Sequence, residues 1–425
     1  MRSRKTNVFY GIDWVLVLMY LSLIFVGWLN IYSVTVTDED LSLLNLTTGY
    51  GKQLLWILLC FPVIVLVLML DVKFYEKFGA IIYLVALLSL VGLFLFGKNI
   101  NGATSWYALG SFTLQPSEFM KAATALAMAK LVSDKQFNLK SPRRQLQAIF
   151  ILFLPAILIT LQPDPGSALV YISFFLVLYR EGLPMYYISF GATAVLLFLL
   201  TLYFGAISIA LILLLIFIIL LIYLSIKRQN LLKRGWPAMS ILFTVTILYV
   251  LGCNLVYNNV FQQRHRDRFD ILLGLSEDTS SIGYNTNQAI KTIASGGFEG
   301  RGFLQGERTQ GHFVPEQDTD YIFTTVGEEW GFIGTTFVIV LFIAFLLRII
   351  TLADRQKMRF SRIYGYSIAA IFFFHFAINI GMVIGLLPTI GIPLPFFSYG
   401  GSGLWGFTLL LFIFIRLDAN RTYEW

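Results

Sequence analysis

A series of long apolar runs limits this chain to very few folds. A helix that crosses a bilayer needs about 20 mostly apolar residues, with about 17 as the lower limit. The sequence offers twelve candidate runs, some of them short, at 12–34, 53–70, 78–96, 116–133, 146–162, 166–180, 186–203, 206–226, 238–257, 325–349, 362–385 and 401–417. The pattern predicts an all-α polytopic membrane protein with about twelve transmembrane helices.

The composition supports a membrane protein and argues against several other classes. Hydrophobic residues make up 57% of the chain and charged residues 13%, whereas a soluble domain carries about 25% charged residues. Cys60 and Cys253 lie in apolar runs without zinc-type spacing, so we expect two small buried side chains. The net charge of +7 lies mainly in short loops, and no basic surface predicts a nucleic-acid partner.

Alternate short loops are basic, and cytoplasmic loops of membrane proteins carry an excess of lysine and arginine. These loops are therefore expected in the cytoplasm, together with both termini. The long polar loop 258–324 then lies outside, because loops of about 60 residues or more escape this rule. The basic residues are Lys73, Lys77, Lys135, Lys140, Arg143, Arg144, Lys227, Arg228, Lys233, Arg234, Arg348, Arg355, Lys357, Arg359 and Arg362.

The loop 258–324 is the one long segment that is polar enough to lie in water. Its mixed stretch 284–294 predicts a short helix at the membrane interface. Arginine suits bidentate contact with phosphate, although a solvated surface explains at least half of the loop's cations equally well. Those cations are Arg264, Arg266, Arg268, Lys291, Arg301 and Arg308.

Acidic residues gather at the far end of this loop, where Glu316, Asp318 and Asp320 precede the tenth run with its Glu328 and Glu329. Clustered carboxylates can bind a divalent cation such as Mg²⁺ or Mn²⁺, or act as a general base. Alternatively, these residues could simply be anions that a helix N-terminus favours. That explanation suits Glu316 and Asp318 better than it suits Asp320. Asp320 and Glu316 are the candidate metal ligands.

Ionisable residues also stand at membrane depth, where a charge costs about 2.5–3.5 kcal/mol by insertion scales. Glu118 and Lys121 are three residues apart in the fourth run and share one helix face. Either a self-neutralised pair or a functional pair fits them. Asp164 lies in a Gln-Pro-Asp-Pro-Gly turn and could face a polar cavity. His375 lies one helical turn from Asn379, and a lone histidine in a membrane span is more often a hydrogen-bonding residue between helices than a ligand.

The proline-rich segment, residues 387–402, has three prolines and three glycines at membrane depth. Irregular backbone there is tolerated only against protein or a water-filled cavity. The segment therefore predicts a re-entrant structure that could form one wall of a substrate groove.

Four motifs in this order make the chain resemble the SEDS family (shape, elongation, division and sporulation), and its RodA branch more than its FtsW branch. The first contains Trp106 and Gln115-Pro116-Ser117-Glu118 with Lys121. The second is Gln162-Pro163-Asp164. The third contains Gly283-Tyr284, Gln288, Ser295-Gly296-Gly297, Pro315-Glu316, Thr319-Asp320 and Glu328-Glu329. The fourth contains Asn379-Ile380-Gly381-Met382, Pro388, Pro393-Leu394-Pro395 and Ser398-Tyr399-Gly400-Gly401-Ser402.

The resemblance implies a peptidoglycan glycosyltransferase that polymerises lipid II during cell elongation and shape maintenance. It implies one integral domain over 1–425, with the family's ten helices plus two extra spans from 186–257. It also implies the bacterial cytoplasmic (inner) membrane, with the long loop on the outer face. The implied partners are a class B penicillin-binding transpeptidase and other membrane proteins of the elongation complex.

The resemblance also assigns site residues. Asp320 matches the family's essential loop aspartate and is expected to be catalytic, while Trp106 and Arg268 match a loop tryptophan and a loop arginine. The expected substrate-binding set is Trp106, Glu118, Lys121, Asp164, Arg268, Glu316, Thr319, Ser398 and Tyr399. The chain departs from the family at Asp318 (usually His), at Ser105 (usually Arg) and at Lys291, which lies one place late.

Two other functions fit a chain of this kind. A lipid II flippase would also need many spans and buried charges, but it should concentrate charge along a path at the membrane midplane. This sequence concentrates its charge in one outer loop. A non-catalytic scaffold of a wall-synthesis complex is the other alternative.

For the glycosyltransferase, displacement at the anomeric carbon of an α-linked donor sugar predicts inversion to a β linkage.

Overall fold

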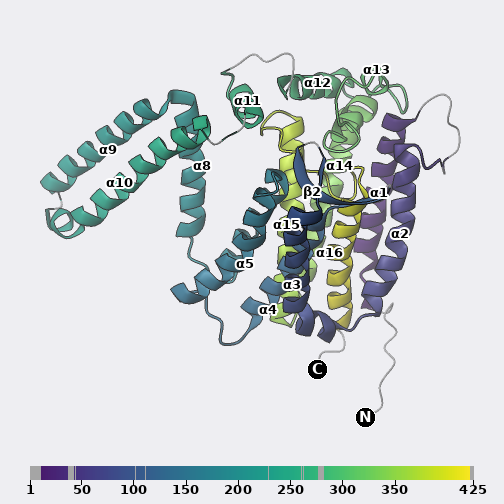
Figure 1. Cartoon of the computed structure of the whole chain (residues 1–425), viewed down its shortest axis with the longest axis horizontal. Helices are drawn as coiled ribbons and strands as arrows, with labels where there is room; N and C mark the ends of the chain where they lie inside the picture. The colour runs from purple at the N-terminus through teal and green to yellow at the C-terminus, as the bar shows by residue number, and fades with distance from the viewer. Residues whose placement is uncertain are drawn as a thin grey trace, which may run out of the picture. The chain divides into compact units, whose positions relative to one another are not determined.

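The computed structural model describes residues 11–36, 43, 45–100, 102–110, 112–227, 229–259, 261, 263–275 and 282–421, and all twelve predicted runs are helical in it (Figure 1). The elements are α1 (Trp14–Thr35), α2 (Gly49–Met69), α3 (Val72–Phe96), β1 (Lys98–Ile100), β2 (Ala103–Leu109), β3 (Phe112–Leu114), α4 (Pro116–Ser133), α5 (Pro142–Thr160), α6 (Pro165–Leu169), η2 (Val170–Ser173), α7 (Phe174–Arg180), α8 (Tyr186–Phe204), α9 (Ala206–Lys227), α10 (Gln229–Asn259), α11 (Gln263–Leu272), α12 (Ile282–Ser295), α13 (Glu307–Gln310), α14 (Phe323–Asp354), α15 (Arg359–Val383) and α16 (Gly401–Asn420).

Ten of the described helices are long and apolar enough to cross a membrane: α1, α2, α3, α5, α8, α9, α10, α14, α15 and α16. The other two predicted runs are helical too. One is α4, which carries the ionisable residues, and the other is divided among α6, η2 and α7. The all-α polytopic fold is therefore confirmed. The number of about twelve spans and the orientation in the membrane stay predictions.

Local chemistry explains where several helices begin and end. The Asp13 carboxylate accepts the backbone N–H of Leu16 at 2.9 Å and caps α1. Pro116 occupies the first turn of α4, where its missing N–H costs nothing. Gly205, with φ of +83°, separates α8 from α9, as the sequence predicted. Gly331 interrupts α14 with φ of +62°.

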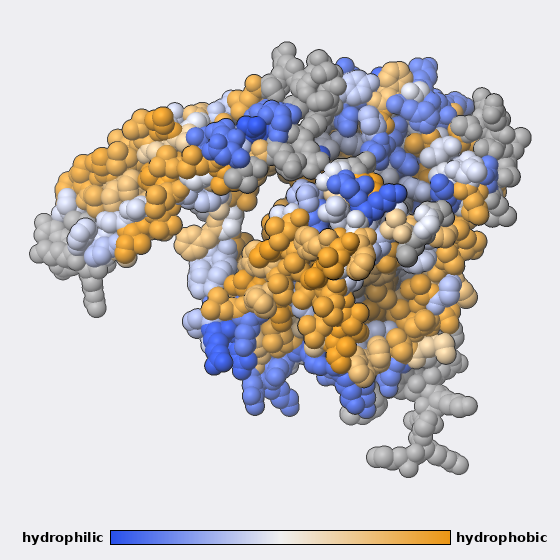
Figure 2. Space-filling view, in the orientation of Figure 1, coloured by the Kyte–Doolittle hydropathy of each residue, from blue (hydrophilic) through white to orange (hydrophobic). Residues whose placement is uncertain are grey.

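The chain divides into two compact units, 1–183 with 285–425 and 184–284. In the first unit, α4, α15 and α16 pack against one another and contribute many of the buried residues. Phe372, Phe396 and Phe407 meet in this core through tilted and edge-on ring contacts. Figure 2 shows apolar residues over the flank of this unit and hydrophilic residues gathered at both of its ends. This surface suits a helix bundle embedded in lipid.

The second unit contains α8, α9, α10 and α11 and has a small core of its own around Ala206, Ile209 and Val250. The hydroxyl of Tyr257 on α10 donates to the Asp270 carboxylate on α11 at 2.7 Å. The two extra spans expected within 186–257 belong to this unit. The single domain over 1–425 stays a prediction.

A small antiparallel sheet joins α3 to α4, and the sequence analysis did not predict it. The strand order is β1-β2-β3, with Lys98 opposite Trp106 and Leu109 opposite Phe112. The N–H of Thr104 donates to the Gln162 carbonyl at 3.2 Å, which ties the sheet to the turn before α6. The sheet therefore lies beside the predicted Gln-Pro-Asp turn.

Candidate functional site

Asp320 stands at the end of the long loop, just before α14, and is half-buried. Its carbonyl accepts a hydrogen bond from the Asn379 side-chain amide at 2.8 Å. The same amide nitrogen donates to the Ile392 carbonyl at 2.8 Å. Asn379 on α15 thus joins the loop end to the proline-rich segment.

The Asp320 carboxylate lies against Gly391, a residue that needs to be glycine. A Cβ at Gly391 would come within 3.3 Å of Asp320 Oδ2, and the φ of this glycine is +80°. A Cβ on Gly166, at the start of α6, would lie 3.0 Å from the Ile390 carbonyl and 3.2 Å from the Gly391 carbonyl. Glycines permit such close approach, so the proline-rich segment fits between the loop end and the 162–166 turn.

Asp164 is the polar centre of that turn, and the turn predicted from the sequence is confirmed. One carboxylate oxygen accepts from the Gln115 side-chain amide at 2.9 Å, and the other caps α6 through the Ser167 N–H at 3.1 Å. The Gln115 backbone N–H donates to the Ser402 hydroxyl at 3.1 Å, and that hydroxyl donates to the Thr113 carbonyl at 3.0 Å. These bonds hold the starts of α4, α6 and α16 together.

Glu118 and Lys121 form a buried ion pair inside the first unit. Both carboxylate oxygens of Glu118 lie 2.8 Å from Lys121 Nζ, as their spacing on one helix face predicted. Lys121 Nζ also lies 2.9 Å from His375 Nε2 and 5.0 Å from the centre of the Phe407 ring. Glu118 is 3% exposed and Lys121 is 0% exposed, so substrate would reach this pair only if the surrounding side chains moved.

The remaining predicted residues of the loop end and the proline-rich segment lie close together. The Tyr399 N–H donates to the Asp318 carbonyl at 2.9 Å, and the Ser398 hydroxyl accepts from the Leu394 N–H at 2.8 Å. Burial raises the pKa of Asp318, and the negative charge of Glu316 raises it further. Glu316 is exposed, and its Oε2 accepts from the hydroxyl of Thr319 at 3.3 Å.

Trp106 and Arg268 come from other elements. Trp106 is partly buried on β2. Its neighbour Ser105 donates to the Gln162 carbonyl at 3.4 Å, so Trp106 lies on the opposite face of the strand. Arg268 is a half-buried residue of α11, in the second unit. Its pairing with Asp320 stays a prediction.

Several charged residues that the sequence offered as candidates have local structural partners. Glu328 accepts the backbone N–H groups of Arg308 at 2.9 Å and Thr309 at 2.8 Å, which caps α13. Arg308 Nε donates to the Thr292 hydroxyl at 3.0 Å, and Arg301 Nε donates to the Ser295 carbonyl at 2.9 Å. The helix predicted at 284–294 is confirmed as α12 (Ile282–Ser295), and its place at the membrane interface stays a prediction.

Metal binding stays a prediction. Within the described ranges, no group of three or more His, Cys, Asp or Glu residues could hold a metal ion. Asp320 and Glu316 still supply two carboxylates at one loop end, and Mg²⁺ is often held by one or two carboxylates together with substrate phosphates.

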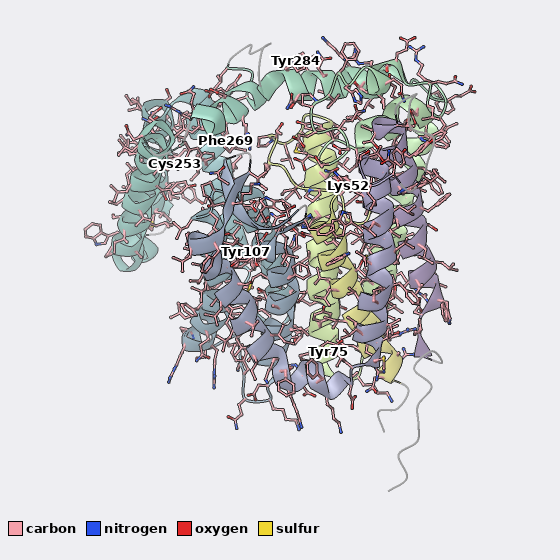
Figure 3. The ribbon with its side chains drawn as sticks, turned by 45° about the vertical axis from the view of Figure 1, so that its right-hand side comes forward. Lys52, Tyr75, Tyr107, Cys253, Phe269 and Tyr284 are labelled. Carbon is pink, nitrogen blue, oxygen red and sulfur yellow. The ribbon has the colours of Figure 1, made fainter. Side chains whose placement is uncertain are left out.

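An apolar groove of about 530 Å³ opens along α2, α3 and α4. Figure 3 shows Tyr75 near the lower end of the view and Tyr107, a residue of β2, above it. At the sheet end the groove reaches Leu114 and Pro116, which flank the Gln115 that holds Asp164. The rest of its lining is Leu66, Val67, Leu70, Phe74, Phe78, Ile81, Ile82, Val85, Ala86, Ser89, Phe119, Ala122, Ala123, Leu126, Leu409 and Ile413.

Together these features define a polytopic membrane protein whose polar site lies where the end of a long loop meets the proline-rich segment, with an apolar groove that reaches the residues beside Gln115. The chain belongs to the FtsW/RodA/SpoVE family of cell cycle proteins, whose model matches residues 13–423. The predicted family is therefore confirmed.

Similar proteins of known name match almost the whole chain. The chain is 32% identical to the peptidoglycan glycosyltransferase RodA of Treponema pallidum, over 99% of this chain and 100% of that protein. It is 28% identical to the peptidoglycan glycosyltransferase MrdB of Escherichia coli, over 92% of this chain and 90% of that protein.

Solved structures share the fold. One is a chain from a peptidoglycan synthase complex that coordinates polymerization and crosslinking, with a TM-score of 0.70, 23% identity and coverage of 97% and 99%. Another is the rod shape determining protein RodA of Thermus thermophilus, with a TM-score of 0.62, 21% identity and coverage of 97% and 98%.

Proposed function

We propose that this chain is a peptidoglycan glycosyltransferase that polymerises lipid II during cell elongation. The observation that carries the proposal is the position of Asp320. Its half-buried carboxylate lies against Gly391, on a segment that also packs on the 162–166 turn. The apolar groove reaches the same neighbourhood. A ligand with a long polyprenyl chain, a pyrophosphate and sugars matches this combination of an apolar groove and a polar end.

The proposed chemistry gives Asp320 one of two roles at the acceptor sugar. Its carboxylate takes the proton from the attacking hydroxyl, or it orients that hydroxyl. The new glycosidic C–O bond forms as the bond between the donor's anomeric carbon and the pyrophosphate oxygen breaks, with inversion. The undecaprenyl pyrophosphate leaves with the bonding electrons.

Cations are needed to stabilise that leaving group. Arg268 is the proposed cationic residue. A Mg²⁺ or Mn²⁺ ion held by Asp320 and Glu316 would supply further positive charge when bound. Trp106, Asp164, Thr319, Ser398 and Tyr399 remain the proposed substrate-binding residues, together with the buried Glu118 and Lys121.

The proposed setting is the bacterial cytoplasmic membrane, with the loop 258–324 on the outer face and a class B penicillin-binding transpeptidase as partner. The likeness to a chain of a peptidoglycan synthase complex supports this assembly. Other membrane proteins of the elongation complex are proposed as further partners.

One observation favours polymerisation over lipid II transport. A transport path at the membrane midplane needs polar groups that face an opening. Glu118, Lys121 and His375 are instead fully buried and bonded to one another. A scaffold role remains the second alternative.

The decisive experiment incubates the purified full-length chain with purified lipid II, with and without its transpeptidase partner, and separates the products on a gel. We expect polymerised glycan strands in the presence of the partner. Lipid II that stays monomeric, while a known polymerase in the same mixture extends it, would overturn the proposed enzyme and leave the flippase and the scaffold.

A further inference from the structure

We propose that His375 is a positioning residue for the site at Asp320, and that the Glu118–Lys121 pair acts through it. This inference rests on the proposed function. The chain of contacts runs from Lys121 Nζ to His375 Nε2 at 2.9 Å, and from His375 Nδ1 to the Pro393 carbonyl at 3.1 Å. It thus leads from a buried ion pair on α4 to the proline-rich segment.

The partners of His375 fix the position of its proton. The Pro393 carbonyl can only accept a hydrogen bond, so Nδ1 carries the hydrogen. In a neutral imidazole Nε2 is then an acceptor, and it faces the Lys121 ammonium, which can only donate. An imidazolium would instead place a second N–H donor against that ammonium. The neutral Nδ1–H form is therefore the one that satisfies both neighbours.

The ion pair explains why this histidine is held so firmly. Lys121 donates to Glu118 and to His375 and lies over the Phe407 ring, and His375 packs edge-on against the same ring at 4.8 Å. His375 is 1% exposed. A ring enclosed in this way has one orientation, which aims Nδ1 at Pro393.

Pro393 lies two residues from the glycine that meets Asp320. Asn379, one turn along α15 from His375, holds the adjacent Ile392 carbonyl and the Asp320 carbonyl. His375 and Asn379 therefore hold the consecutive carbonyls of Pro393 and Ile392. These bonds set the position of Gly391 beside the Asp320 carboxylate. A displacement of about 1 Å at a catalytic group can cost about 100-fold in rate, so this support should control turnover.

This arrangement gives the buried pair a function beyond its proposed part in substrate binding. Glu118 orients Lys121, Lys121 orients His375, and His375 orients the backbone that supports the site. The chemistry at His375 needs one donor and one acceptor in fixed places and no change of protonation. Glutamine offers the same two groups in a neutral amide, whereas leucine offers neither.

The experiment compares His375→Leu with His375→Gln in the full-length chain, using the lipid II polymerisation assay at several substrate concentrations. Ser367→Ala is the matched control, because Ser367 is a buried polar residue of the same helix whose hydroxyl bonds only to the Ile363 carbonyl of that helix. Hydrogen exchange of the 387–402 amides is followed in all four proteins.

We expect His375→Leu to lower kcat by about 100-fold with little change in KM, and to speed exchange in the proline-rich segment. His375→Gln should recover most of the rate and the protection, and Ser367→Ala should match the wild type. A KM effect alone, an unchanged rate in His375→Leu, or no recovery in His375→Gln would overturn the proposal.

Two further results keep the test decisive. If His375→Leu does not fold, His375→Asn replaces it, because its shorter amide can reach only one of the two partners. Exchange in the segment should then be faster than in His375→Gln, and equal exchange would overturn the proposal. If the wild type makes no polymer, the proposed function fails, while the exchange data still decide whether His375 positions the segment.

Discussion

The two ends of the first unit hold their carboxylates in opposite ways. At the end where α1 begins and α16 finishes, Arg348 bonds Asp13 at 3.1 and 2.5 Å, and Arg355 bonds Asp418 at 3.1 and 2.5 Å. Burial alone would raise the pKa of Asp13, but its bonds to Arg348 and to the Leu16 N–H, with the charges of Arg348 and Arg355, lower it. Charge stabilises the fold here.

At the other end, neutral groups make the direct contacts to the proline-rich segment. Asn379 and His375 bind backbone carbonyls, and the Tyr321 hydroxyl lies 2.7 Å from the Thr389 hydroxyl. Burial raises the pKa of Asp318, and the negative charge of Glu316 raises it further. The ionised Asp318 carboxylate therefore lowers the stability of the fold. Proteins tolerate such costs mainly at functional sites. The difference indicates that the first end serves stability and the second serves chemistry.

The largest expected stability effect tests the buried pair that supports the second end. Lys121→Met leaves the Glu118 carboxylate without its cation in the bundle, which should cost about 3–5 kcal/mol. The thermal midpoint of the purified chain, followed by tryptophan fluorescence, should fall clearly.

The double variant Glu118→Leu/Lys121→Met is the control for that effect. Replacing a buried ion pair with apolar residues is often neutral for stability, so the thermal midpoint should recover. Activity should stay low, because His375 still lacks Lys121. If the double variant polymerises lipid II like the wild type, the pair matters for stability alone and the contrast between the two ends disappears.

The sequence predicted much of this architecture because its signals are local. Apolar runs of sufficient length predicted every helical span, Gly205 predicted a break, and three-residue spacing predicted the Glu118–Lys121 pair. The small sheet was missed, because strands of three to seven residues give little periodic signal.

The long-range partners were beyond a single sequence. Nothing in the local pattern pairs Gln115 with Asp164, 49 positions away, or Lys121 with His375, 254 positions away. Those contacts depend on how helices pack, and packing is a property of the whole fold. The polar character of His375 and Asn379 could be noted in the sequence, but not the carbonyls that they hold.

A test with a smaller expected effect compares one carboxylate variant from each end of the unit. Asp13→Asn removes a charge-assisted bond and should cost about 1.5–3 kcal/mol at pH 7. The pKa of Asp13 is lower in the folded chain, so its contribution is complete above the unfolded value of about 4. That contribution disappears as pH falls through the folded pKa, so the loss caused by the variant should shrink under acid.

Asp318→Asn should act in the opposite direction. The pKa of Asp318 is raised by folding, so its charge opposes folding above the unfolded value of about 4. The variant should therefore gain stability at pH 7, by less than about 1 kcal/mol, and the gain should vanish near pH 4. Thermal midpoints of both variants from pH 8 down to below pH 4 test this, because the Asp13 contribution changes only below its unfolded value of about 4. Shifts of the same sign would contradict the contrast.

The most direct measurement replaces Asp320 with asparagine and follows polymerisation of purified lipid II by the reconstituted full-length chain with its partner. Asparagine keeps the shape of the side chain and leaves the carbonyl that Asn379 holds. We predict a folded protein and no polymer. Polymer formed at the wild-type rate would contradict a site built on Asp320.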